Sequence, residues 1–141
     1  MRRRPKTSQI CDNMIIAKAY ALNDGGDVVS SWYAHYGRWP KITTKLDLKM
    51  IHLLQQNRDG WTRPHYDTLR DGVGEIRFKA KGILHRPLGY FGPNRNDFTF
   101  LFFATKKDDF EPPNAIDIAV ERRIQIEQLR ARIVEINRWQ P

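Results

Sequence analysis

The chain is poor in cysteine and has no long apolar run, and each absence excludes a class of protein. A single cysteine, Cys11, stands among 141 residues, which excludes an internal disulfide framework and a zinc site built from several cysteines. No run reaches the roughly 18 apolar residues that a membrane span requires, and no hydrophobic segment of signal-peptide length follows the opening Met1-Arg-Arg-Arg. We therefore expect a cytoplasmic protein.

Acidic residues are scarce beside basic ones. The chain has 24 Lys and Arg against 16 Asp and Glu, a formal net charge of +8. Such an excess favours a polyanionic partner: nucleic acid, a ribosome, or an acidic protein that neutralises the surface. The 40% hydrophobic fraction indicates one globular domain, which at this length buries roughly two-thirds of its unfolded surface.

The first half of the chain predicts an extension, a strand and two helices. Residues 1–13 are basic and polar without periodicity, so we expect a disordered extension, followed by a single domain over residues 14–141 that opens with a strand over 14–22. Asp27 is a typical N-cap for a helix that ends at Gly37. Pro40 suits the first turn of a second helix, which ends near residues 57–60, and the short link predicts a helical hairpin.

The second half predicts a loop, three strands and one long helix. Residues 61–71 have the composition of a loop, and strands are expected at about 74–79, 84–91 and 98–104. The third strand is apolar on both faces, which is typical of a central strand. An amphipathic pattern from 114 to 138 predicts a long C-terminal helix whose distal half extends beyond the sheet.

Two arginines are expected to face each other across the first hairpin of this sheet. Both a two-residue loop at Lys81-Gly82 and a four-residue loop over residues 80–83 place Arg77 directly opposite Arg86, at the ~5 Å separation of cross-strand neighbours. Like charges placed so are destabilising unless an anion lies between them. A bound phosphate is one interpretation, because two guanidinium groups can hold phosphoryl oxygens bidentately. Neutralisation by Glu75 is the other.

Further candidate residues lie on the same strands. Lys106 and Lys107 follow the third strand, where they lie beside the arginine pair or form an ordinary solvated turn. His85 alternates to the face opposite Arg86 unless Pro87 introduces a bulge that re-aims it. Tyr90 lies on the Arg86 face, where it either stacks on a base or belongs to the core.

These motifs, in this order and spacing, resemble the RelE/HigB superfamily of toxin–antitoxin toxins, in particular its phage-derived branch. The resemblance covers roughly residues 14–126. It is carried by Leu69, Gly72, Glu75-Ile76-Arg77, His85-Arg86, the run from Phe98 to Ala104, Lys106-Lys107, Pro112 and Ala119. With the predicted elements, it implies an α+β fold: a RelE-like small antiparallel sheet of about four strands, packed with the N-terminal helical hairpin and a long C-terminal helix.

The resemblance implies an endoribonuclease that cleaves mRNA, commonly on the ribosome, and so inhibits translation. An RNA 2′-hydroxyl can attack its own adjacent phosphate, so neither a metal nor another cofactor is expected. Charge stabilisation falls to Arg77 and Arg86, positioning or acid catalysis to Lys106 or Lys107, and His85 is a further catalytic candidate. The expected RNA-binding residues are Lys79, Lys81 and Tyr90.

The implied partner is a cognate antitoxin, of the helix-turn-helix kind that accompanies HigB-like toxins, in a complex that can be a heterotetramer. Two other functions stay open from the sequence. One is a toxin of the same fold that acts on a protein such as DNA gyrase, which would tolerate loss of the arginine pair. The other is a nonenzymatic phage-derived nucleic-acid-binding protein.

Overall fold

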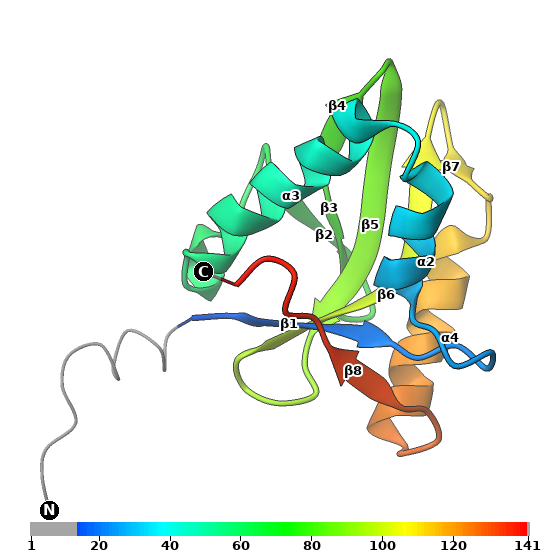
Figure 1. Cartoon of the computed structure of the whole chain (residues 1–141). Helices are drawn as coiled ribbons and strands as arrows, with labels where there is room; N and C mark the ends of the chain where they lie inside the picture. Colours follow the sequence, from blue (N-terminus) through cyan, green and yellow to red (C-terminus); the bar gives the residue numbers. More distant parts are fainter. Residues whose placement is uncertain (1–13, 141) are drawn as a thin grey trace, which may run out of the picture.

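Two long antiparallel strands, β5 (Ile83–Phe91) and β6 (Asp97–Lys106), form the centre of the sheet. The structure is a computed structural model, and it describes residues 14–140. In β6 the side chains of Phe98 and Phe100 enter the core on one face and Leu101 enters the core on the other, all fully buried. The prediction of a central strand that is apolar on both faces is therefore confirmed (Figure 1).

The sheet around these two strands is mixed and has eight strands in the described part of the chain. Its order is β2-β3-β5-β6-β1-β8, with β4 beside β5 and β7 beside β6, and β1 runs parallel to β6. The predicted antiparallel sheet of about four RelE-like strands is therefore wrong. The remaining strands are β1 (Ile16–Tyr20), β2 (Tyr66–Arg70), β3 (Val73–Ile76), β4 (Phe78–Ala80), β7 (Phe110–Glu111) and β8 (Ile133–Glu135).

Both predicted N-terminal helices are present, as α2 (Val28–Tyr36) and α3 (Pro40–Leu54). The Asp27 carboxylate caps α2 by accepting the Ser30 N–H at 2.8 Å, and Pro40 occupies the first turn of α3, where its missing N–H costs nothing. A 3₁₀ turn, η1 (Arg58–Gly60), follows α3. The expected loop over residues 61–71 is wrong in its second part, because Tyr66–Arg70 pairs with β3 as an edge strand.

The long C-terminal helix is the second correction. Helix α4 (Ala115–Glu127) is shorter than predicted, and the chain leaves it through Leu129, which has a φ of +60° and is 92% exposed. Residues Ile133–Glu135 then pair with the otherwise open edge of β1 as β8. Beyond β8, the buried indole of Trp139 donates to Asp47 of α3 at 2.9 Å. A continued helix would have left both contacts unmade.

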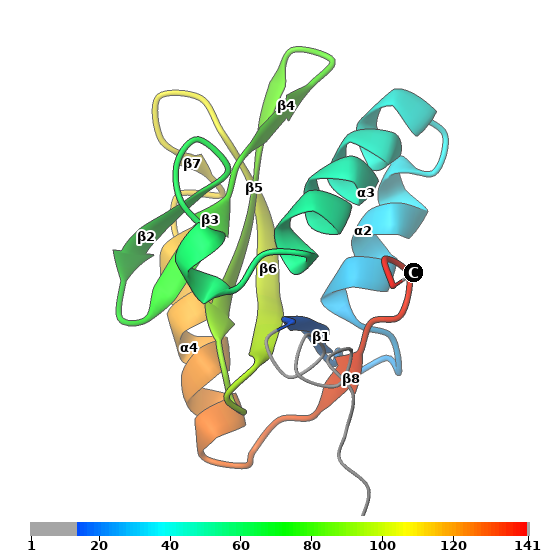
Figure 2. The ribbon, with the colours of Figure 1, turned by 90° about the vertical axis from the view of Figure 1, so that its left-hand side faces the viewer.

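Helices cover the two faces of the sheet unequally. An aromatic-rich core joins one face to α2 and α3, whereas the core on the other face is formed under α4. Figure 2 shows α3 beside the β4–β5 hairpin, and the tip of the hairpin projecting past the end of α4. Within residues 14–140, no helix is long and apolar enough to cross a membrane. The extension expected over residues 1–13 lies outside the described residues.

Candidate phosphate-binding site

The strand register brings Arg77 and Arg86 together, as the sequence predicts. Strands β3 and β4 pair with β5 in one common register that continues through the break at Arg77 between them, so Arg77 lies in line with Arg86. Pro87, next to Arg86, has no N–H to give to the ladder, and the Arg77 N–H instead donates to the His65 carbonyl at 2.9 Å. The hairpin turns through Lys81-Gly82, both with positive φ, which is the two-residue alternative.

Two rows of side chains cross this face of the sheet, because paired residues on neighbouring strands point to the same side. The two rows contain six residues, and four of these are Lys or Arg. We call these four residues the cation block. They grade from the exposed Lys79, through the partly buried Arg77 and Lys106, to the buried Arg86. The first row is Arg77, Arg86 and Ala104, and the second is Lys79, Leu84 and Lys106.

One carboxylate, that of Glu75, lies beside the two guanidinium groups. Its Oε2 accepts from Arg77 Nη1 at 2.6 Å, and its Oε1 is 3.7 Å from Arg86 Nε. The side chains of Glu75 and Arg86 are only 2% and 6% exposed, whereas that of Arg77 is 25% exposed. Glu75, which was the alternative to phosphate, is therefore shared by both arginines, and Asp67 on the neighbouring strand also interacts with Arg77.

The buried arginine is incompletely bonded. Arg86 Nη1 donates to the His85 carbonyl at 2.9 Å, but Arg86 Nε and Glu75 Oε1 have no hydrogen-bond partner among the described residues. Burial lowers the pKa of Arg86, and the neighbouring Arg77 lowers it further against the opposing effect of Glu75. Buried polar groups without partners are costly, so Arg86 Nε can gain from an added acceptor, whereas Glu75 Oε1 can gain only from an added donor.

The two lysines after the central strand differ in position. Lys106 ends β6 in the second row of the cation block, with its Nζ 5.0 Å from the centre of the Phe110 ring. Lys107 lies beyond the strand, is exposed, and has its Nζ 3.9 Å from a carboxylate oxygen of Glu111. Of the predicted pair, the register thus brings Lys106 to the arginines and leaves Lys107 in a solvated turn.

His85 lies on the opposite face of β5 from Arg86, so Pro87 does not re-aim it. Its ring stacks on Phe78 with centroids 4.8 Å apart and meets Trp32 edge to face at 5.9 Å. The side chain is 1% exposed, and neither ring nitrogen has a hydrogen-bond partner within residues 14–140. Burial, followed by the charge of Arg86, lowers the pKa of His85 to about 4, so it is a neutral residue of the aromatic core.

The three predicted RNA-binding residues are also separated. Tyr90 is buried under α4, where its hydroxyl donates to Glu127 at 2.8 Å, so it belongs to the core and does not stack on a base. Lys79 belongs to the cation block, while Lys81 lies at the tip of the hairpin. Sequence reasoning did not foresee that Arg63, exposed before β2 and ion-paired with Asp67, also lies near Arg86; its single signal was membership of a basic chain.

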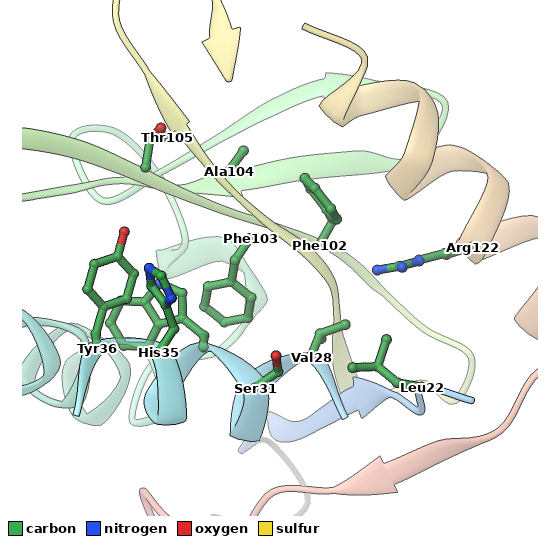
Figure 3. A pocket seen from close by; sticks show the side chains of 11 residues that line it. Leu22, Val28, Ser31, His35, Tyr36, Phe102, Phe103, Ala104, Thr105 and Arg122 are labelled. Carbon is green, nitrogen blue, oxygen red and sulfur yellow. The ribbon is translucent and has the colours of Figure 1, made fainter. Parts of the chain in front are cut away.

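A separate cavity of about 400 Å³ lies between α2 and β6. Figure 3 shows His35 and Tyr36 lining it from α2 and Phe102 from β6, with Arg122 reaching toward it from α4. Arg122 donates to the Leu101 carbonyl at 2.8 Å and lies over the Phe102 ring, so its charge already has a structural use. The cavity contains none of the cation block.

Within the part of the chain that the structure describes, no three His, Cys, Asp or Glu side chains are grouped so as to hold a metal ion. Comparisons of the chain with protein-family models, with curated proteins and with solved structures give no significant match. The functional argument therefore depends on the residues themselves.

Proposed function

We propose that the protein is the toxin of a toxin–antitoxin pair and acts in the cytoplasm as a metal-independent endoribonuclease on mRNA, in association with the ribosome. The observation that carries the proposal is the cation block: two rows on one sheet face with four cations, two of which share the carboxylate of Glu75. Glu75 balances the one fully buried cation, Arg86, whereas Arg77, Lys79 and Lys106 are accessible and can supply positive charge to a phosphate. The sequence resemblance supplies the biological class.

The proposed reaction is transesterification within the RNA. The 2′-hydroxyl loses its proton to solvent water as its oxygen bonds to the adjacent phosphorus, the bond from phosphorus to the 5′-oxygen breaks, and the products are a 2′,3′-cyclic phosphate and a 5′-hydroxyl. Arg77 binds the non-bridging oxygens, whose negative charge grows in the transition state, and Arg86 supports it from beneath. Lys106, on the same face, protonates the departing 5′-oxygen, while Lys79 binds a neighbouring phosphate.

A cleavage assay tests this proposal. End-labelled RNA is incubated with wild-type protein or with Arg77→Gln, with and without ribosomes, in the presence of EDTA. The amide of Gln can still donate to Glu75, so the variant keeps the fold while losing the charge. We expect cyclic-phosphate products from wild type and a loss of at least about 100-fold in rate for the variant. Equal rates for the two proteins would remove the cation block from the mechanism.

A second function, binding of nucleic acid without cleavage, is favoured by one observation. His85 lies on the far face, and the Glu75 carboxylate is held by Arg77, so neither side chain is placed to take the proton of the attacking 2′-hydroxyl. Tight binding of RNA that stays intact with and without ribosomes would decide for this alternative. In either case, an antitoxin would act by covering the cation block.

A further inference from the structure

A groove with a volume of about 760 Å³ lies between α3 and the β4–β5 hairpin. Figure 2 shows the two elements side by side at the top of the molecule. From α3 the groove is lined by Lys41, Lys45 and Leu48, whose i, i+4, i+7 spacing places them on one side of the helix. Lys79, Ala80 and Lys81 line it from the hairpin, but strand alternation directs the Lys79 side chain to the opposite face, where the cation block lies.

The rim of this groove is positively charged throughout. Lys41, Lys45 and Lys81 bring positive charge to it, no acidic residue among residues 14–140 lines it, and none of these three lysines forms an ion pair there. Lys41 and Lys45 repel each other at i, i+4 on the helix, which costs roughly 0.2–0.5 kcal/mol. The rim therefore fits an occupant that brings negative charge.

The floor of the groove is apolar. Leu48 is 61% exposed, and Ile51, almost one turn further along α3, is 42% exposed. Pro40 and Ala80 add apolar surface at the end and side of the groove. Large aliphatic side chains exposed together beside a rim of like charges are typical of a protein-binding surface.

We propose that this groove binds an acidic amphipathic helix of a partner protein, with its leucine-like side chains over Leu48 and its carboxylates at Lys41, Lys45 and Lys81. Helix-in-groove docking of this kind reads apolar anchors at i, i+3 or i+4, and i+7. RNA fits less well, because an aliphatic floor contributes nothing to a phosphate backbone and no aromatic side chain among residues 14–140 lines the groove to stack a base. The inference does not rest on the proposed cleavage of RNA.

Two labelled peptides of identical composition test the proposal by fluorescence anisotropy on the full chain. In the first, leucines form one face of an 18-residue helix that is rich in glutamate; in the second, the same residues are permuted so that the leucines are spread around the helix. We expect the first to bind at least about tenfold more tightly, since only it can place its apolar face on the floor. Equal affinities, or no binding at about 1 mM peptide, would overturn the proposal.

Three variants locate the binding. Leu48→Ser should remove most of the difference between the peptides, and the double variant Lys45→Glu, Lys81→Glu should weaken both peptides by at least about tenfold. Arg95→Glu, an exposed charge reversal in the turn between β5 and β6, is the matched control and should stay within about twofold. Circular dichroism confirms that each variant is folded. If the double variant no longer bound a uridine oligonucleotide but still bound the first peptide with the wild-type affinity, the groove would be an RNA-binding surface instead.

Discussion

His85 and Arg86 are adjacent in one strand and both are buried, yet they lie in opposite surroundings. His85 faces α2 and α3, where aromatic rings enclose a neutral imidazole. Arg86 faces the other side, where it shares the carboxylate of Glu75 with Arg77 and lies near the positive charge of Arg63. The comparison indicates that one face of the sheet is built for stability and the other carries charge that packing alone does not require.

The largest expected effect breaks the charged face. Glu75→Gln leaves Arg77 and Arg86 without a counter-charge in a buried position, so we expect a loss of about 3–5 kcal/mol in the free energy of unfolding. Denaturant unfolding measures it, with Asp67→Asn on the more exposed pair with Arg63 as the control. A loss below about 1 kcal/mol would mean that Glu75 is not the anion that holds the cluster.

The next effect sharpens the aromatic face. The pKa of His85 is lowered to about 4 in the folded protein, against an ordinary value of about 6.5. Between pH 6.5 and pH 4 the imidazole is therefore protonated in the unfolded chain but neutral in the folded one. The free energy of unfolding falls as the pH drops below about 6.5, by about 3 kcal/mol at pH 4. Unfolding of wild type and His85→Leu between pH 7 and pH 4 isolates this contribution. If the free energy of unfolding fell equally with pH in both proteins, the imidazole would be protonated in the folded core and the account would be wrong.

The smallest effect separates the two lysines that the sequence left equivalent. Lys106→Gln should weaken RNA binding about threefold and lower the salt slope by ~0.7, because Lys106 belongs to the cation block. Lys107→Gln should have the smaller effect, since its ammonium is solvated and lies near Glu111. Affinities for a 2′-O-methyl RNA, which resists attack, measure both. A larger loss of affinity in Lys107→Gln than in Lys106→Gln would mean that RNA binds at the turn after β6 and not at the cation block.

Local signals predicted much of the architecture. The cap at Asp27 and the proline at position 40 identified the two helices, and the Lys81-Gly82 turn fixed the register that aligns Arg77 with Arg86. The helix cap, the proline and the turn each depend only on residues that are close in the sequence, so they can be recognised from one sequence alone.

Long-range contacts decided what the sequence did not predict. The apolar residues Ile133 and Ile136 fit a helical stripe as well as a strand. The strand forms because its backbone can hydrogen-bond to the otherwise unpaired edge of β1. Residues 66–70 form an edge strand that buries few of its side chains, so their polar composition did not indicate a strand. The burial of Glu75 between two arginines likewise depends on three strands meeting.

The most direct test of the account is the salt dependence of RNA affinity in wild type and Arg77→Gln. If Arg77 binds a phosphate, the variant binds the 2′-O-methyl RNA at least about tenfold more weakly, and its plot of log affinity against log salt is shallower by ~0.7. Two superimposed plots, with the same affinity and slope, would contradict the account: the arginine pair would then be a structural ion cluster held by Glu75.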